Sequence, residues 1–200
     1  MRKPIGKWGV FVTRGQPFHI GHISVIEKAL KENDQVLVVI GSADKRGLDR
    51  NPLSIETRTI LFSKIKEYLG AEESKRLHYI CLDDWSSEDD IPYESAVGST
   101  NTNFEGVSAD WGMYLYYNIV TYTKAKSFTL YYNDSAEILE SWFPTFICDR
   151  IKVKASKRVE KVSSSEVRQA LKDNNVKYLT QVLPYLNKEE IKIIQREVCI

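Results

Sequence analysis

The sequence predicts an α/β fold, a doubly wound, parallel five-stranded sheet with helices on both faces. Two patterns lead to this prediction. Short apolar runs alternate along the chain with segments that have the apolar repeat of a helix. The run QVLVVI at 35–40 is apolar almost throughout, which is typical of a parallel strand covered on both faces. A helix over 20–33 joins this run to a first strand at 8–12, and the three together form a βαβ unit.

The remaining elements follow from the same patterns, and we expect all 200 residues to form one domain whose C-terminal helical part spans about 163–200. The segment 86–109 is polar and lacks a clear period, so we expect a mobile flap or functional loop there. The helix after the N-cap Ser54 should end at Gly70, and Asp110 should cap a later helix. That first helix should bury Leu61, Ile65, Tyr68 and Leu69. Further strands are predicted at 77–82, 128–132 and about 146–153, and further helices at 54–69, 111–122, about 134–142, 163–171, 176–183 and 187–198.

Composition and charge exclude several classes of function. The formal net charge is +1, so no overall positive field favours nucleic acid or an anionic membrane. The three cysteines are odd in number and contain no CxxC pair, which argues against a disulfide framework or a zinc site and favours a reducing compartment. No apolar run approaches the length of a membrane span. We therefore expect a cytoplasmic protein with no nucleic-acid or membrane partner.

The stretch FVTRGQPFHIGH at 11–22 predicts a phosphate site. It reads as the end of a strand, a turn at Gly15, and the first turn of a helix. The N-terminus of a helix binds anions because it offers unsatisfied N–H groups and the positive end of the helix dipole. His19 and His22, at i and i+3, can point the same way from this turn, and Arg14 adds a positive charge just upstream.

A second helix start, SSSEVR at 163–168, has a similar character. Ser163 and Glu166 form a capping box, which by itself explains the motif as a plain helix cap. Together with the histidine motif, however, it reads as the other half of a triphosphate clamp. Its serines supply hydroxyl groups, and Arg168 can hold a phosphate with two parallel hydrogen bonds.

Polar clusters follow the predicted strands, directly or after a short basic loop. They lie at 13–22, 41–50, 83–85, 133 and 163–168. The carboxyl ends of parallel strands meet at one edge of a sheet, so we expect these clusters to converge on one ligand site there. The chain contains neither GxxxxGK[ST] nor a GxGxxG after its first strand, which disfavours P-loop enzymes and ordinary dinucleotide folds.

Three segments resemble one family. RGQPFHIGH closely resembles the GRFQPFHxGH signature of nicotinamide-mononucleotide adenylyltransferases, within the wider nucleotidyltransferase group marked by HxGH. SSSEVR resembles that group's second signature, ISSTxIR, and GSADKRGLDRNPLSIETR looks like the corresponding archaeal-type segment. The chain departs from the first signature at Thr13 and Gly15, where the family has glycine and phenylalanine.

The resemblance implies a Rossmann-like nucleotidyltransferase fold and a reaction in which nicotinamide mononucleotide (NMN) attacks ATP to give NAD and pyrophosphate. Mg²⁺ is expected on the phosphates, with no metal site built from protein carboxylates. By position in the motifs, the catalytic residues would be His19, His22 and Arg168. The ATP and its phosphates would contact Thr13, Arg14, Gln16, Arg50, Ser163, Ser164 and Ser165. The nicotinamide nucleotide would contact Gly41, Ser42, Asp84, Trp85, Trp111 and Asn133, where an indole can stack on the pyridinium ring.

Other functions stay open at this point. HIGH at 19–22 with KASKR at 154–158 is similar to the HIGH and KMSKS pair of class I aminoacyl-tRNA synthetases, but the chain is short for such an enzyme. Sister nucleotidyltransferases act on phosphopantetheine, nicotinate mononucleotide or glycerol phosphate and share HxGH. A sensor that binds NAD or ATP without catalysis is a further alternative. The sequence also leaves open whether copies form a homo-oligomer.

Overall fold

The computed structural model describes residues 6–84, 104–132, 142–155 and 162–199. Five parallel strands form one sheet in the order β3-β2-β1-β4-β5, so the predicted α/β fold is confirmed. The strands are β1 (Trp8–Thr13), β2 (Gln35–Ile40), β3 (Leu77–Cys81), β4 (Phe128–Tyr132) and β5 (Ile151–Ala155).

The carboxyl ends of the three strands on one side of the sheet are level. Thr13 is paired with Ile40, and Ile40 with Cys81. The chain order reverses between β1 and β4, which are neighbours in the sheet although two other strands lie between them in sequence. In open α/β sheets, ligands bind beyond the carboxyl ends of the strands at such a reversal.

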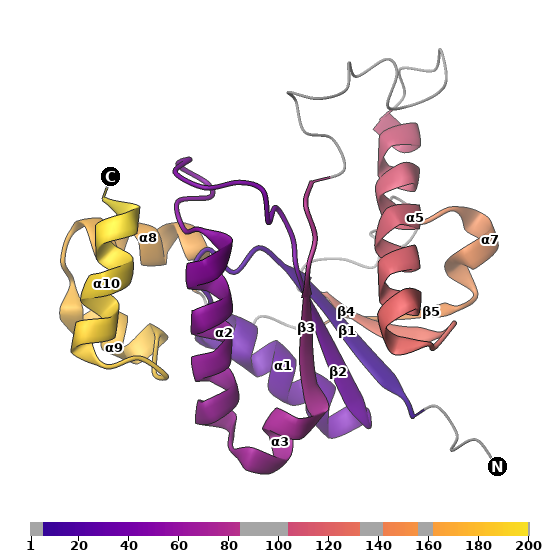
Figure 1. The fold of residues 1–200 in the computed structure, drawn as a ribbon, viewed down its shortest axis with the longest axis horizontal. Helices are drawn as coiled ribbons and strands as arrows, with labels where there is room; N and C mark the ends of the chain where they lie inside the picture. The colour runs from indigo at the N-terminus through magenta and orange to yellow at the C-terminus, as the bar shows by residue number, and fades with distance from the viewer. Residues whose placement is uncertain (1–5, 85–103, 133–141, 156–161, 200) are drawn as a thin grey trace.

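Helices cover both faces of this sheet (Figure 1). One face carries α1 (Ile20–Glu32) and α2 (Ile55–Leu69), and α8 (Ser164–Lys172), α9 (Val176–Val182) and α10 (Lys188–Val198) lie beside α2. The opposite face carries α5 (Phe104–Thr123) and α7 (Thr145–Cys148), while the short α3 (Ala71–Arg76) leads into β3. The buried apolar residues form two clusters, one on each face of the sheet, because strand residues at alternate positions point to opposite faces.

The C-terminal helices belong to the same apolar core as α1 and α2. Leu171, Leu179 and Ile191 are buried in one cluster with Ile26 of α1 and Phe62 of α2. This packing brings α8 up to the first strand's loop, which is far away in sequence.

Several predicted boundaries were wrong. In α2, Tyr68 is 50% exposed rather than buried and Leu69 is only partly buried, because the buried face runs through Arg58, Phe62 and Ile65 and Tyr68 lies to one side of it. The predicted strand at 146–153 begins only at Ile151, because α7 follows Pro144 and occupies the preceding residues.

The predicted end of the loop at 86–109 was also wrong, since α5 begins at Phe104. Asp110 therefore lies inside a helix and does not cap one. The rest of that loop, and most of the helix predicted at 134–142, lie outside the described residues. The short helix α3 was not predicted.

Gly112 allows α5 to approach the chain before α7. A Cβ built on this residue would lie 1.6 Å from the carbonyl oxygen of Trp142 and 3.0 Å from the Cα of Phe143. These are backbone atoms, so they cannot move aside as the end of a flexible side chain would. Gly112 therefore fixes how closely α5 packs on this segment.

We expect Gly112→Ala to destabilise the protein. Alanine favours a helix interior by about 1 kcal/mol relative to glycine, but the backbone clash should outweigh that gain. The expected net loss in the free energy of unfolding is at least ~1 kcal/mol, or about 2–4 °C in Tm. Gly41→Ala is the matched control, because nothing lies within 4 Å of its added Cβ. Equal Tm values for the two variants in thermal denaturation would contradict the close approach.

Candidate active site

The two histidines cap the helix that carries them. His19 is the N-cap of α1, with φ −144° and ψ 174°, and its Nδ1 accepts a hydrogen bond from the N–H of Gly21 at 3.2 Å. In return, Nδ1 of His22 accepts from the N–H of His19 at 3.1 Å. This is the reciprocal arrangement of a capping box, with histidines in place of Ser and Glu. The predicted placement of both histidines at the helix start is therefore confirmed.

This arrangement fixes the tautomer of His22. The ring is 7% exposed, and burial, together with the nearby His19, holds the pKa of His22 well below its ordinary value. A neutral ring whose Nδ1 accepts a hydrogen bond must carry its proton on Nε2. The ring of His19 is also buried, and the ring centroids are 3.9 Å apart. His22 thus presents a neutral N–H donor, next to the buried ring of His19, at the positive end of a helix dipole.

The two departures from the family signature compensate for each other locally. Gly15 has φ +62°, a backbone conformation that favours glycine, and a Cβ there would lie 2.4 Å from the ring of Phe18. The hydroxyl of Thr13 accepts a hydrogen bond from the N–H of Gly15 at 3.2 Å. Thr13 therefore stabilises the turn that Gly15 makes.

Gln16 joins this turn to the segment after β2. Its side-chain amide donates to the carbonyl of Leu53 at 3.0 Å and accepts from the N–H of Leu53 at 2.9 Å. Gln16 is buried, so in this structure it acts as a clip between two loops. Its predicted contact with ATP stays a prediction.

The start of α8 lies directly against the histidine loop. Arg168 donates to the carbonyl of Gln16 at 2.9 Å and to the hydroxyl of Ser165 at 3.2 Å. The hydroxyl of Ser164 donates to the carbonyl of Pro17 at 3.4 Å. The predicted meeting of the two signatures is therefore confirmed, although about 150 residues separate them in sequence.

The cap at this helix start is also as predicted. Ser163 accepts a hydrogen bond from the N–H of Glu166, whose carboxylate accepts from the N–H of Ser163 in return. The capping carboxylate lies at the positive end of the α8 dipole, and Arg168 follows about one turn later.

The pKa of Arg168 responds to burial and to three neighbouring charges. Burial lowers the pKa of Arg168, and the positive charges of Arg50 and Arg14 lower it further, while the carboxylate of Asp49 raises it. Arg14 and Arg50 are exposed. The positive charges of Arg14 and Arg50 therefore act on Arg168, and such a combination of positive charges favours an anion.

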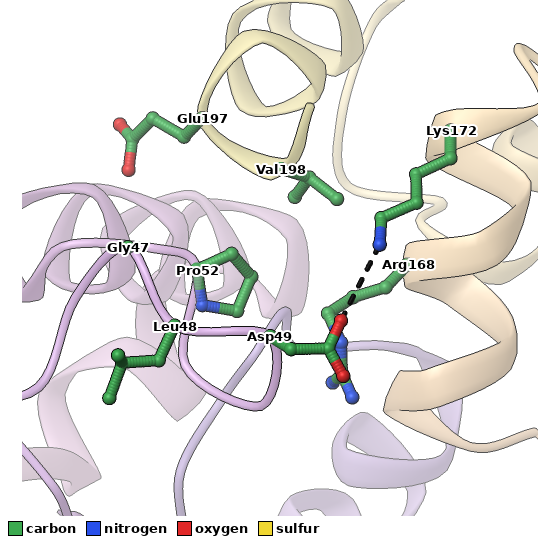
Figure 2. A pocket seen from close by; sticks show the side chains of 8 residues that line it. All are labelled: Gly47, Leu48, Asp49, Pro52, Arg168, Lys172, Glu197 and Val198. Carbon is green, nitrogen blue, oxygen red and sulfur yellow. Dashed lines mark hydrogen bonds and ion pairs between the residues drawn. The ribbon is translucent and has the colours of Figure 1, made fainter. Parts of the chain in front are cut away.

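A cavity of about 230 Å³ lies beside Arg168 (Figure 2). It is enclosed by α8, the end of α10 and the segment 47–52, which we call the 47–52 loop. Lys172 and Arg168 both extend from α8 toward Asp49 of this loop, and Nζ of Lys172 forms an ion pair with Asp49 at 3.5 Å. Sequence reasoning missed Lys172, because an exposed lysine at the end of a helix carries no distinguishing signal.

The predicted residues of the nicotinamide side are only partly described. The hydroxyl of Ser42, which follows Gly41, donates to the carboxylate of Asp84 at 2.8 Å, and the N–H of Asp84 donates to Asp44 at 3.0 Å. Trp85 and Asn133 lie outside the described residues. The structure therefore links the ends of β2 and β3 through Ser42 and Asp84.

An aromatic cluster lies beyond the end of β4. Trp111 of α5 is half-buried, and its ring centroid is 6.4 Å from that of Trp142, which in turn is 6.0 Å from that of Tyr132. Sequence reasoning selected Trp111 but missed Trp142 and Tyr132. A useful signal was available, since Tyr132 is the last residue of a predicted strand.

Arg58 is the most important residue that sequence reasoning missed. This arginine of α2 has no exposed surface and lies in the apolar stripe of its helix, where Leu61 and Ile65 flank it at helical spacing. A charged residue inside an otherwise apolar helical stripe is the signal that could have identified it.

Glu197 of α10 was missed as well. Its carboxylate accepts hydrogen bonds from the N–H of Ser54 at 3.0 Å and from the hydroxyl of Thr57, at the N-terminus of α2. A carboxylate is stabilised at this end of a helix dipole. The last helix thereby anchors the helix that carries Arg58.

The described residues contain neither a cluster of metal-ligating side chains nor a membrane-spanning helix. Within the described ranges, no group of three or more His, Cys, Asp or Glu side chains lies together as a metal site would require. None of the described helices is both long and apolar enough to cross a membrane.

Comparison with known proteins identifies the family of this chain. The chain matches the cytidylyltransferase-like family over residues 10–170. It belongs to this family. The match includes the histidine motif, the 47–52 loop and Arg168.

Named relatives within this family act on nicotinamide nucleotides. The chain is 34% identical over 109 residues to the nicotinamide-nucleotide adenylyltransferase of Pyrococcus furiosus, covering 51% of this chain and 55% of the relative. It is 33% identical over 75 residues to the nicotinamide/nicotinic acid mononucleotide adenylyltransferase of Acinetobacter baylyi, covering 38% of each. The matched stretches thus span about half the length of these curated relatives or less.

A solved structure shows the same fold. The bifunctional NMN adenylyltransferase/ADP ribose pyrophosphatase of Francisella tularensis, complexed with AMP and a manganese ion, superposes with a TM-score of 0.70. The alignment covers 97% of this chain and 52% of that chain at 18% sequence identity. This likeness confirms the Rossmann-like nucleotidyltransferase fold.

The depressed pKa of His22 predicts a pH dependence of stability. The folded state binds a proton at His22 less readily than the unfolded state does, so its contribution to stability is present above the unfolded pKa of about 6.5. It is lost as the pH falls from there toward the folded pKa, with a slope of at most ~1.4 kcal/mol per pH unit. NMR titration of the histidine side chains should show His22 neutral at pH 6.5. A His22 resonance that titrates like free histidine would contradict the assignment.

Proposed function

We propose that this protein is an adenylyltransferase that joins NMN to the AMP part of ATP, giving NAD and pyrophosphate. The contact between the two signatures is the observation that carries this proposal. Arg168 reaches across to the carbonyl of Gln16, so the start of α8 and the capping histidines of α1 border one site. The named relatives and the shared fold support the choice of reaction.

In the proposed reaction, a phosphate oxygen of NMN attacks the α-phosphorus of ATP. A new P–O bond forms, the bond to the bridging oxygen of the β-phosphate breaks, and its electron pair leaves with pyrophosphate. Such a transfer depends mainly on positioning and charge stabilisation. His19 and His22 would donate from Nε2 to phosphate oxygens as negative charge develops. Arg168, with Ser163, Ser164 and Ser165, would hold the β- and γ-phosphates that leave.

The remaining residues would place the two substrates. Arg14 and Arg50 are exposed, as phosphate ligands must be, and their positive charges act on Arg168. Thr13 and Gln16 would shape the turn around the ATP. Gly41, Ser42, Asp84, Trp85, Trp111 and Asn133 would contact the nicotinamide nucleotide. ATP would enter as its Mg²⁺ complex, with the ion held mainly by phosphate oxygens, because Mg²⁺ is usually bound through substrate phosphates with few protein ligands.

A second acceptor is supported by one relative. The Acinetobacter baylyi protein is named for both nicotinamide and nicotinic acid mononucleotide. The described residues on the nicotinamide side carry the carboxylates of Asp84 and Asp44, which favour a neutral amide over an anionic acid by charge repulsion. NMN is therefore the preferred acceptor in this proposal. We also predict that the protein acts in the cytoplasm. Whether it forms homo-oligomers stays an open prediction.

The direct test is pyrophosphate release by the purified chain with ATP and Mg²⁺. NMN, nicotinate mononucleotide and phosphopantetheine are compared as acceptors at equal concentration. Release that is fastest with NMN supports the proposal. Release only with another acceptor would move the protein to a sister reaction, and nucleotide binding without release would favour a sensor.

His19→Asn separates capping from catalysis. Asparagine is a good N-cap, so this variant should keep the cap of α1 and its Tm. It cannot reproduce the Nε2 donor, and removing one preorganised donor should lower kcat by about a hundredfold or more. The control is His78→Asn, because His78 lies at the start of β3, at the opposite end of the sheet, and should leave kcat unchanged. Near-normal turnover of His19→Asn would remove His19 from the mechanism.

Arg168→Lys tests the phosphate clamp. Lysine replaces a planar fork with a single ammonium, which cannot hold a phosphate and the carbonyl of Gln16 together. We expect KM for ATP to rise about tenfold, the scale of one charged hydrogen bond. Lys172→Gln is the matched control, since it removes a charge one turn further along α8 and breaks only a surface ion pair with Asp49. An unchanged KM for ATP in Arg168→Lys, alongside a raised KM in Lys172→Gln, would mean that the positive charge matters and the fork does not.

A further inference from the structure

Arg58 connects the ends of two strands through backbone carbonyls. Its NH1 group donates to the carbonyl of Arg14 at 3.1 Å and to that of Gly41 at 2.8 Å, and its NH2 group donates to the carbonyl of Ser42 at 2.9 Å. Its Nε donates to the carbonyl of Ser54 in its own helix at 3.3 Å. One guanidinium group therefore ties the loop after β1, the loop after β2 and the first turn of α2 together.

Burying this guanidinium group costs free energy. Arg58 is completely buried, and among the described residues no carboxylate is hydrogen-bonded to it. Burial lowers the pKa of Arg58, and the negative charges of Asp44 and Asp84 only partly offset that effect. An apolar side chain of similar volume usually stabilises such a position at least as well. The special contribution of Arg58 is the direction in which it holds three carbonyl groups.

The direction of a carbonyl also sets the direction of the next N–H. In a planar trans peptide the two groups point opposite ways. The carbonyl of Gly41 points at Arg58, so the N–H of Ser42 points away from α2. Ser42 itself has φ +52°, a conformation that few non-glycine residues adopt, and it is 2% exposed.

The N–H of Ser42 belongs to a buried residue and is a potential hydrogen-bond donor to a ligand. The neighbouring N–H groups are satisfied, that of Gly41 by the carbonyl of Thr13 and that of Ala43 by the carbonyl of Leu82. Within the described part of the chain, the Ser42 N–H donates no hydrogen bond. Buried backbone N–H groups are almost always paired, so this donor points to a ligand atom.

We propose that Arg58 is a positioning residue, which holds the carbonyls of Arg14, Gly41 and Ser42 so that the Ser42 N–H donates to an acceptor atom of the mononucleotide. Because the same group holds Arg14, it also links the ATP side of the site to the mononucleotide side. This inference rests on the proposed adenylyl transfer for the identity of the ligand, NMN.

The Arg58→Lys variant keeps the positive charge, but a single ammonium group cannot replace the planar fork that donates to the three loop carbonyls. We expect KM and Kd for NMN to rise about tenfold or more, with a smaller change in kcat, because a lost hydrogen bond to a charged group is worth about that factor. The matched control is Ile65→Val, which destabilises the same buried face of α2 without touching either loop. Both variants are compared at a temperature where circular dichroism shows them fully folded.

A second measurement needs no variant. In the wild-type protein, the amide resonance of Ser42 should shift on addition of NMN and not on addition of inorganic phosphate. Together the two experiments separate the possible failures. Arg58→Lys binding NMN like Ile65→Val, or an unmoved Ser42 resonance in a wild-type protein that binds NMN, would overturn the role of Arg58. A wild-type protein that binds NMN but releases no pyrophosphate would overturn the adenylyl transfer alone, while one that binds no NMN would overturn both.

Discussion

The reciprocal capping of α1 by its own histidines is the interaction on which the site depends. A helix start leaves N–H groups without partners, and here the imidazoles of His19 and His22 supply two of the acceptors. Each ring is thereby held in place through Nδ1. Burial keeps His22 neutral, so its other nitrogen carries a proton that can be donated. One set of hydrogen bonds thus ends the turn, starts the helix and orients the groups proposed to act on phosphate.

Around this cap, the site is assembled from segments that are distant in sequence. Gln16 clips the turn to Leu53, Arg168 reaches it from α8, and Arg58 binds the loops after β1 and β2. Glu197 in turn anchors α2 from the last helix. All of these contacts go to backbone groups, so they fix the path of the chain and leave the outward-facing side chains to meet substrates. Rigid placement of this kind is what adenylyl transfer requires.

The sequence was informative where a local pattern has one physical meaning. The βαβ start, the capping box at Ser163 and the meeting of the HxGH and SSSEVR motifs were predicted correctly, because alternation of apolar runs and helix-start chemistry depend on neighbouring residues. It was misleading at Tyr68 and at Phe146. Tyr68 is exposed because it lies to one side of the buried face of α2, and Phe146 is exposed on α7, where a strand was predicted.

By itself, the sequence determined the fold class, the family and the residues of the two signatures. The tertiary structure alone decided which groups hold these residues in position. In the sequence, Arg58 stands out only as a charge within an apolar helical stripe, Glu197 looks like a surface charge on an amphipathic helix, and Trp142 looks like an ordinary core residue. Their roles arise from contacts with segments far away in the chain. Such contacts leave no local periodicity, because they are set by how helices pack on the sheet and not by the spacing of residues within one element.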